Sequence, residues 1–262
     1  MEITKDFIEK ITEFGKSLAE EVVYIQKNDR GAVFKGDMSP LTKADIHSND
    51  RIKNFLLENT PVSNIISEEI KTNSFQERCQ WDYYWVIDPI DGTKEFVSGG
   101  DDFCINIALC HDNTPVFGYV ICPKHHDHYY AIRDRGAYKN GYRIYSSNSY
   151  FLRDPVLNVV ASKSHMNDQT AAYIEELENK YNVKLLNYGS SLKFCMIADG
   201  TAHVYPRFGP TMEWDTCAPQ IIVEESGGSV YNTDTNQPLV YNKEDLLNPY
   251  FIVASPTYNR LQ

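Results

Sequence analysis

The spacing of apolar residues in the first sixty positions predicts two helices. Between residues 7 and 22, apolar side chains recur at intervals of three or four, which places them on one face of a helix. A second helix is expected at about 45–58, with Ile52, Phe55 and Leu56 on its buried side. Both helices are therefore expected to pack one face against a core.

A series of short strands is expected after these helices. Residues 64–67 form a short apolar run that ends at Glu68-Glu69, and the aromatic and β-branched run at 83–87 is typical of a buried strand. The polar stretch 70–79 is the best candidate for a mobile loop. Turn sequences separate the next strand-like segments and indicate an antiparallel region: 104–110, 116–121 and 128–133.

The pattern changes near residue 150 to an alternation of strands and helices. The expected strands are 156–161, 183–186 and 202–205, and the helices between them are 168–181 and 191–198. A helix at 214–225 and a final strand at 251–254 follow. Because proline is tolerated only in the first turn of a helix, Pro219 limits where the helix at 214–225 can begin. We predict two intimately packed α/β halves, 1–150 and 151–262, with a boundary around 140–155.

Composition narrows the class of protein. The chain has 262 residues, enough for a substantial core. Its formal net charge is −11, whereas a nucleic-acid-binding protein typically has a basic surface. No apolar run reaches membrane-spanning length and the first residues show no signal segment, so no integral membrane segment is predicted and the cytoplasm is the expected compartment. The six cysteines include no C-x-x-C pair and are expected to be reduced, mostly buried thiols.

The segment from Trp85 to Phe96 carries the strongest chemical signal. A buried strand delivers Asp88 and Asp91 around a proline turn, and Gly92-Thr93 then opens a short helix. Two carboxylates this close repel each other unless a cation lies between them, whereas free N–H groups at a helix start attract an anion. A divalent-metal site beside a phosphate site, and hence phosphoryl chemistry, is predicted.

Other acidic residues could complete such a metal site. Magnesium prefers hard oxygen ligands, and strand ends and helix starts gather polar groups in one crevice of an α/β protein. Glu68 and Glu69 follow a predicted strand, and Asp215 begins a predicted helix. Taken alone, Asp215 is better interpreted as a helix N-terminal charge and the glutamates as a solvated loop.

The spacing of the two aspartates disfavours an aspartyl-phosphate mechanism. Haloacid-dehalogenase phosphatases use Asp-x-Asp-Gly-Thr, with the carboxylates two positions apart. Here Pro89 stands two positions before Asp91, and the other acid, Asp88, is three positions away. An activated water is therefore favoured as the nucleophile.

Residues 85–96, together with Trp214-Asp215-Thr216, resemble the signature pair of the inositol monophosphatase superfamily of magnesium-dependent, lithium-sensitive phosphatases. Lys94-Glu95-Phe96 and the segments 189–195 and 205–211 are similar to its CysQ-type 3′(2′),5′-bisphosphate nucleotidase branch. The resemblance extends from residue 41 to residue 249. It implies an α/β fold layered as an α-β-α-β-α sandwich.

The resemblance also implies the metal ligands. Carried over position by position, Glu68, Asp88 and the backbone carbonyl of Ile90 would hold a first Mg²⁺, and Asp88, Asp91 and Asp215 a second. Two metals about 3.5–4 Å apart can stabilise the attacking and leaving oxygens of an in-line displacement.

The resemblance implies three catalytic residues: Asp45, Thr93 and Glu69. Thr93, hydrogen-bonded to Asp45, would orient and deprotonate the attacking water. Glu68 or Glu69 would help to hold a weaker third ion through water. On its position alone Asp45 would be interpreted as a helix N-cap.

Substrate contacts follow from the same resemblance. The N–H groups of Gly92 and Thr93 would bind the phosphate, and the metal-site residues Glu68, Asp91 and Asp215 would also face the substrate. The remaining nucleotide contacts implied are His165, Ser190, Lys193 and Arg207. The implied reaction is hydrolysis of 3′-phosphoadenosine 5′-phosphate, a nucleoside bisphosphate, to AMP and phosphate.

Several alternatives stay open. Lys193 alone would be a solvated helix face and His165 a strand-end cap. The rival functions are an inositol-1-phosphatase or broad sugar phosphatase of the same superfamily, and a non-catalytic metal- or nucleotide-sensing protein.

The residues 125–128 (His-His-Asp-His) are better interpreted as a solvated turn than as a soft-metal site. Monomer and homodimer are both compatible with the sequence, and no basic amphipathic helix supports the peripheral attachment to the inner membrane known for related proteins.

Overall fold

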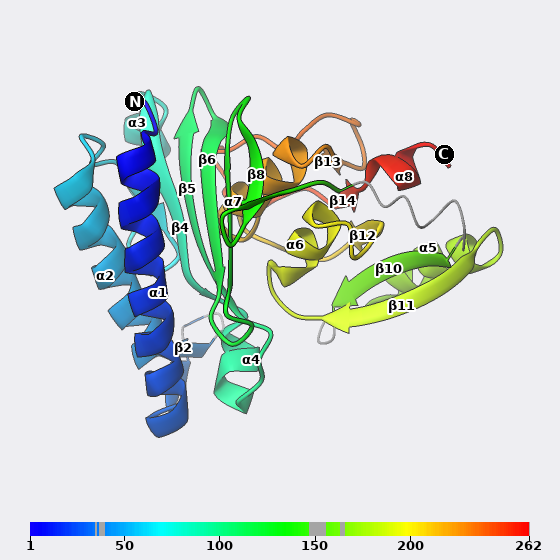
Figure 1. The fold of residues 1–262 in the computed structure, drawn as a ribbon, viewed down its shortest axis with the longest axis horizontal. Helices are drawn as coiled ribbons and strands as arrows, with labels where there is room; N and C mark the ends of the chain where they lie inside the picture. The colour runs from blue at the N-terminus through cyan, green and yellow to red at the C-terminus, as the bar shows by residue number, and fades with distance from the viewer. Residues whose placement is uncertain (35, 37–39, 147–155, 163–165, 262) are drawn as a thin grey trace.

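The computed structural model describes residues 1–34, 36, 40–146, 156–162 and 166–261. Two sheets lie between layers of helices, in the predicted α-β-α-β-α order (Figure 1). Helices α1 (Lys5–Asn28) and α2 (Lys43–Asn59) cover the outer face of the larger sheet. Helices α6 (Leu192–Ala198) and α7 (Glu213–Glu225) lie between the sheets, and α5 (Asp168–Glu178) covers the far side of the smaller one.

The larger sheet has seven strands in the order β3-β4-β5-β6-β7-β8-β9. In it β3 and β4 run parallel, and every other neighbouring pair is antiparallel. Short turns join the strands from β5 to β9, whereas helix α4 lies in the connection between β4 and β5. The strands are β3 (Ile65–Ser67), β4 (Tyr83–Asp91), β5 (Cys104–His111), β6 (Thr114–Cys122), β7 (Asp127–Ile132), β8 (Gly136–Lys139) and β9 (Tyr142–Ile144).

The smaller sheet has five strands in the order β11-β10-β12-β14-β13. Here β10 is parallel to β11 and β12, whereas β14 pairs antiparallel with β12 and β13. The strands are β10 (Val156–Ser162), β11 (Asn182–Tyr188), β12 (Val204–Arg207), β13 (Ser229–Asn232) and β14 (Phe251–Ala254).

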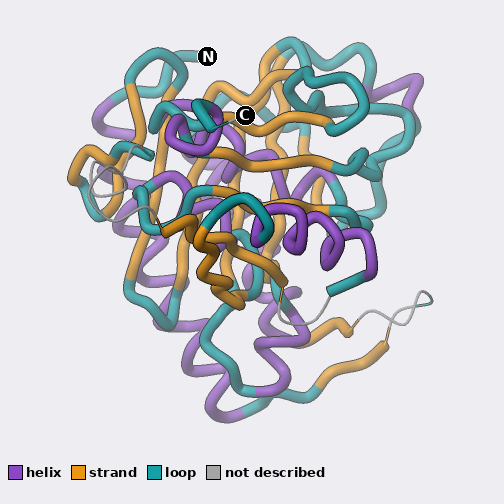
Figure 2. The backbone as a smooth tube through the Cα atoms, turned by 90° about the vertical axis from the view of Figure 1, so that its right-hand side faces the viewer, coloured by secondary structure: helices purple, strands orange, loops and turns teal. Residues whose placement is uncertain are grey.

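Short elements complete the chain: β1 (Ala32–Phe34), β2 (Pro40–Thr42), α3 (Phe75–Arg78), α4 (Thr93–Ser98) and α8 (Pro256–Asn259). The two chain ends lie at the same end of the sheets and on opposite sides of the layers (Figures 1 and 2). Among the described residues, no helix is both long enough and apolar enough to cross a membrane.

Strand β4 shows how the core is divided. Its side chains alternate, so that Trp85 and Ile87 pack with α1 and α2, whereas Tyr84 and Val86 pack in the core that contains α6 and α7. The strand is buried on both faces, and this rigid strand carries the two aspartates of the predicted metal site.

The predicted long elements are confirmed, but the short strands β1, β2, β8, β9 and β13 were not predicted. The segment 70–79 contains α3 and is held by buried Arg78, whose guanidinium donates to Asn242 Oδ1 and to the carbonyl of Lys243. The predicted boundary at 140–155 includes residues 147–155, which lie outside the described residues, so the division into halves stays a prediction.

The expectation for Pro219 is wrong. Helix α7 begins at Glu213, so Pro219 lies in the second turn rather than the first. A proline there leaves the carbonyl four residues earlier, that of Asp215, without its helical N–H donor. Ser191 Oγ, from the start of α6, lies 3.1 Å from this carbonyl oxygen, so a side chain of another element contacts the carbonyl that the proline leaves without its helical partner.

Candidate active site

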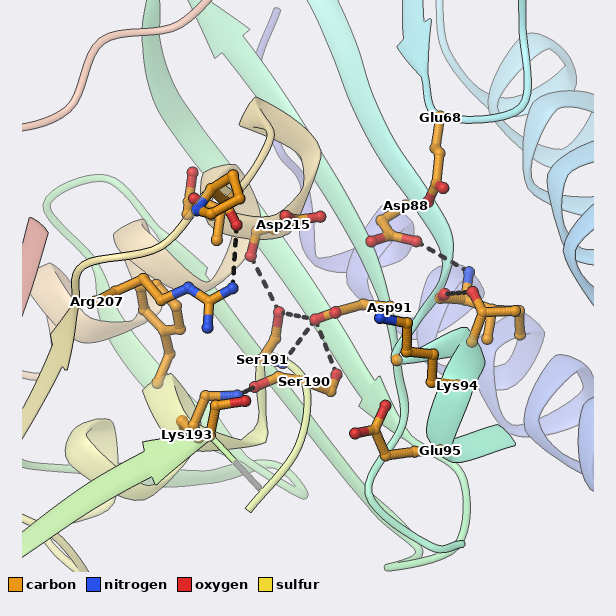
Figure 3. Close-up of a pocket in the computed structure, with 18 of the residues that line it drawn as sticks. Glu68, Asp88, Asp91, Lys94, Glu95, Ser190, Ser191, Lys193, Arg207 and Asp215 are labelled. Carbon is orange, nitrogen blue, oxygen red and sulfur yellow. Dashed lines mark hydrogen bonds between the residues drawn. The ribbon is translucent and has the colours of Figure 1, made fainter. Parts of the chain in front are cut away.

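Three carboxylates from distant parts of the chain meet at one end of the larger sheet. Asp88 and Asp91 lie at the end of β4, where the pairing with β5 shifts register, and Asp215 lies in the first turn of α7. One oxygen of each lies within 4.8 Å of one oxygen of the other two. Figure 3 shows them around a common space, with Glu68 pointing toward Asp88.

Asp88 lies deepest in this group and is 1% exposed. Its Oδ1 accepts the Ile90 N–H at 3.0 Å, which fixes the side chain against its own turn. Burial raises the pKa of Asp88 well above its usual value, and the nearby carboxylates of Glu68 and Asp91 raise it further. The free protein therefore carries an unfavourable concentration of negative charge at this point.

Asp215 shares this environment. One of its oxygens, Oδ2, accepts the Met212 N–H at 2.8 Å and so caps α7, which leaves Oδ1 for another partner. Burial and then the charge of Asp91 raise the pKa of Asp215 to about 8, although the bond from Met212 acts in the opposite direction.

The donor set fits a hard divalent cation. All three groups offer carboxylate oxygens, the ligands that Mg²⁺ prefers, and a cation between them would remove the repulsion that contributes to the raised pKa values of Asp88 and Asp215. Glu68 lines the same cavity as Asp88 and Ile90. Glu69, predicted to be catalytic, is half-buried and does not line that cavity; its N–H lies 3.4 Å from Ser67 Oγ.

Asp45 and Thr93 meet as the resemblance implies. Thr93 Oγ1 lies 3.3 Å from Asp45 Oδ1 and 3.0 Å from the carbonyl oxygen of Ile90. Asp45 is not the N-cap of α2; it is the third helical residue, and its Oδ2 accepts the N–H of the true N-cap, Thr42, at 2.7 Å. Burial raises the pKa of Asp45, while its bonds from Thr42 lower it.

Two cations lie on the other side of a cavity of about 280 Å³. Lys193 Nζ donates to the carbonyl of Ser190 at 2.7 Å and lies 5.1 Å from the centre of the Tyr205 ring. Burial lowers the pKa of Lys193 to about 8, although the negative charge of Asp91 acts in the opposite direction. Arg207 is 9% exposed and donates to the carbonyl of Pro210 at 3.0 Å. Both cations are therefore oriented by the backbone toward the cavity that the acids line (Figure 3).

The other predicted contacts lie around the same cavity. Gly92, with φ of 91°, and Thr93 line it, and a Cβ at Gly92 would lie 3.1 Å from the carbonyl oxygen of Asp102. Ser190 also has a left-handed φ of 56°, and its hydroxyl donates to Asp91 Oδ2 at 2.8 Å. His165 lies outside the described residues.

Sequence reasoning missed two buried polar residues beside Asp91. Ser191 donates to Asp91 Oδ2 from its N–H at 2.6 Å and from its hydroxyl, and Asn106 Nδ2 lies 2.8 Å from Ser191 Oγ. A signal was present for Asn106, since it is a single amide inside the apolar run at 104–110. A buried polar side chain in such a strand needs partners, and here they surround a predicted ligand.

The histidine-rich turn is not a metal site within the described part of the chain. His125 instead lies 3.4 Å from Asp102 Oδ1, and the groups with metal-ligand spacing do not include residues 125–128. The preferred interpretation as a turn is consistent with this. The cysteines are free, and all but Cys79 are buried, as expected.

Comparison with known proteins gives a consistent result. The model of the inositol monophosphatase family matches residues 2–261. The 3′(2′),5′-bisphosphate nucleotidase CysQ of Salmonella typhimurium is 34% identical over 249 residues, covering 94% of this chain and 99% of that protein. The CysQ protein of Escherichia coli strain K12 is 36% identical over 233 residues, covering 88% of this chain and 92% of that protein.

Solved structures show the same fold. The crystal structure of CysQ from Bacteroides thetaiotaomicron is similar with a TM-score of 0.76 at 39% identity, covering 90% of this chain and 93% of that one. An IMPase/NADP phosphatase complexed with Mg²⁺ and phosphate has a TM-score of 0.80 at 21% identity, covering 98% of this chain and 93% of that chain, a likeness of fold alone. The layered fold, the acidic cluster and these matches agree, and the chain belongs to the inositol monophosphatase family.

Proposed function

We propose that this protein is a Mg²⁺-dependent 3′(2′),5′-bisphosphate nucleotidase that hydrolyses 3′-phosphoadenosine 5′-phosphate to AMP and phosphate. One observation carries the proposal: the three clustered carboxylates share a single cavity with two oriented cations, Lys193 and Arg207. A monophosphate needs only the metal side of such a cavity, whereas a bisphosphate needs both sides. The names of the relatives at 34–36% identity support the same substrate class.

Two ions would be held by the acids at the end of β4 and their neighbours. Glu68, Asp88 and the Ile90 carbonyl would hold the first, and Asp88, Asp91 and Asp215 the second, with a third, weaker ion near Glu68 and Glu69. Bound there, Mg²⁺ supplies a water of lowered pKa and positive charge for the phosphoryl oxygens.

The chain's own residues would deprotonate the water. Thr93 Oγ1 can accept the water's proton as it passes its own to Asp45 Oδ1, 3.3 Å away. Burial makes Asp45 a stronger base than an exposed aspartate, because its pKa is raised. The water oxygen then forms its bond to phosphorus as the bond to the ribose 3′ oxygen breaks. That oxygen would leave as an alkoxide that takes up a proton from solvent, and Asp45 would release the proton it received from the water, through Thr93, back to solvent.

The remaining residues would orient the substrate. The N–H groups of Gly92 and Thr93 would bind the reacting phosphate, and Lys193 and Arg207 the second phosphate. Arg207 offers a planar fork for two phosphate oxygens, while Lys193 acts as a point charge. Since the protein carries a net charge of −11, these two local cations decide whether a dianionic group can enter.

Phosphate release tests the proposal directly. We expect kcat/KM for 3′-phosphoadenosine 5′-phosphate to exceed that for inositol 1-phosphate by about 10²-fold, the value of one strong charge-assisted contact. EDTA should abolish both activities. Equal values, or a preference for inositol 1-phosphate, would support the rival phosphatase, and no release from any substrate at saturating Mg²⁺ would support a sensing protein.

A further inference from the structure

One oxygen of Asp91 is already saturated by protein donors. Oδ2 accepts the Ser190 hydroxyl at 2.8 Å, the Ser191 N–H at 2.6 Å and the Ser191 hydroxyl (Figure 3). Asn106 Nδ2 lies 3.4 Å from the same oxygen. A carboxylate oxygen offers two lone pairs, so this set leaves it no capacity for a cation. Only Oδ1 of Asp91 remains for a metal.

The direction of these bonds can be assigned from chemistry. Asn106 Nδ2 donates to Ser191 Oγ at 2.8 Å, and an amide nitrogen cannot accept. The Ser191 hydroxyl therefore accepts from Asn106 and uses its single proton toward Asp91. Asn106 is fully buried in β5, directly opposite Asp88 in the ladder, so the strand pair that places one ligand also places this donor.

The same hydroxyl lies against the helix that carries Asp215. Because Pro219 has no N–H, the Asp215 carbonyl lacks its helical donor, and Ser191 Oγ contacts this carbonyl oxygen at 3.1 Å. Asn106 Nδ2 lies 3.5 Å from the neighbouring Trp214 carbonyl. Ser191 and Asn106 thus contact both β4 and the start of α7, the two elements whose separation sets the distance between Asp91 and Asp215.

We propose that Ser191 and Asn106 are positioning residues of the metal site. They fix Asp91 as a ligand through Oδ1 alone and hold its distance from Asp215. Asn106 acts mainly through Ser191, because its bond to Ser191 Oγ at 2.8 Å is much shorter than its approach to Asp91 Oδ2 at 3.4 Å. This inference rests on the proposed function only in taking the acidic cluster as a cation site, since it needs no particular substrate.

Direct binding of Mn²⁺, counted from the EPR signal of the free ion in the absence of nucleotide, tests this role. Ser191→Ala should weaken Mn²⁺ binding about tenfold, at the low end of what loss of a metal ligand's supporting partner costs. Asn106→Ala should weaken it about fivefold. An unchanged Mn²⁺ affinity in Ser191→Ala, with unfolding still cooperative, would overturn the proposal.

A double-mutant cycle separates positioning from general damage. Because Asn106 acts through Ser191, the double variant should bind Mn²⁺ about as weakly as Ser191→Ala alone, about tenfold below the parent, whereas independent effects would multiply to about fiftyfold. The control is Ser190→Ala, which removes a different donor to Asp91 and does not contact Asn106; its effect should multiply with that of Asn106→Ala. Multiplication in the Ser191 cycle overturns the proposal.

The cycle stays informative if Asn106→Ala fails to fold, because Asn106→Leu keeps the volume of the buried side chain while removing the amide. Phosphate release in the same variants separates the two proposals. Weakened Mn²⁺ binding in a protein that hydrolyses no nucleotide would support the positioning role and contradict the proposed function. Normal Mn²⁺ binding in an active nucleotidase would do the reverse.

Discussion

The two sheets differ in what they contribute to the cavity. Strands β4 and β5 of the larger sheet are buried on both faces and bring Asp88, Asp91 and Asn106 to their ends. The smaller sheet has an exposed edge strand, β11; its strand β12 carries Arg207, and helix α6, between the sheets, carries Lys193. The buried aspartates of β4 thus belong to the larger sheet, and the two buried cations come from the opposite side of the cavity.

This difference separates chemistry from selection. Ligands held in a buried ladder cannot move apart to relieve their repulsion, so they are suited to bind a cation. The cations of the opposite side are oriented by backbone carbonyls and can be changed without disturbing the ladder. We therefore expect changes on the metal side to affect all substrates equally and changes on the cation side to affect only the bisphosphate.

The largest effect is expected from Asp88→Asn. Loss of the ligand shared by both ions should lower kcat about 10³-fold for every substrate, since a metal supplies several kcal/mol of transition-state stabilisation. The metal-free protein should unfold at the same temperature or higher, because a buried repulsive charge is removed. Asp50→Asn on the exposed side of α2 is the matched control. Retained turnover in Asp88→Asn would show that the site is misplaced.

Lys193→Ala should divide the substrates. Loss of a charge-assisted contact should raise KM for 3′-phosphoadenosine 5′-phosphate by about 10²-fold, with much less effect on inositol 1-phosphate. Lys184→Ala, at an exposed position on β11, should change neither. If both substrates respond alike to Lys193→Ala, the comparison between the two sides fails and Lys193 is structural.

The pH profile sharpens the same division. Lys193 has a pKa of about 8, so it loses its charge as pH rises through that value. For the bisphosphate, kcat/KM should then fall by up to about tenfold per pH unit, and inositol 1-phosphate should not show this fall. Lys193→Arg keeps the charge and should remove the alkaline limb. A limb of equal size for both substrates would assign the titration to another group.

The last effect expected is on the stability of the metal-free protein. Asp215 has a pKa of about 8 in the fold and an ordinary one of 3.8, so between these values the folded protein holds a proton that the unfolded chain has released. Stability in EDTA should therefore fall as pH rises from about 5 to about 8, by on the order of 1 kcal/mol per pH unit. In the presence of Mg²⁺, thermal unfolding should show the opposite trend, with stability rising as pH rises over this range. A metal-free protein whose stability rises over this range would contradict the raised pKa.

The sequence alone was sufficient to predict those helices and strands whose hydrophobic periodicity is strong. The buried strand at 83–87 and the amphipathic helix from residue 7 could be predicted, because each buries one continuous apolar face or run. Strands β8 and β9 were missed because they are only four and three residues long and show no such pattern; β8 begins with a glycine, and the side chains of β9 are exposed or half-buried. Pro219 misled because the Asp215 carbonyl that it leaves without a helical partner is contacted by Ser191 from another element, and no local rule includes such a contact.

The candidate site shows the same limit. Asp88 and Asp91 are three positions apart on one turn, so their meeting is local. Their approach to Asp215 depends on where α7 lies, and its prediction rested on the family resemblance. The supporting roles of Asn106 and Ser191 depend on side-chain bonds between β5, α6 and β4, which no pattern along the chain records.

The central claim is that the three clustered carboxylates hold paired divalent cations next to a bound ester. A crystal soaked with Mn²⁺ and examined by anomalous diffraction tests it most directly. The account predicts peaks bonded to Asp88, Asp91 Oδ1 and Asp215, with a second peak beside Glu68. An empty cluster at saturating Mn²⁺, or an ion bonded to Asp91 through Oδ2, would contradict it.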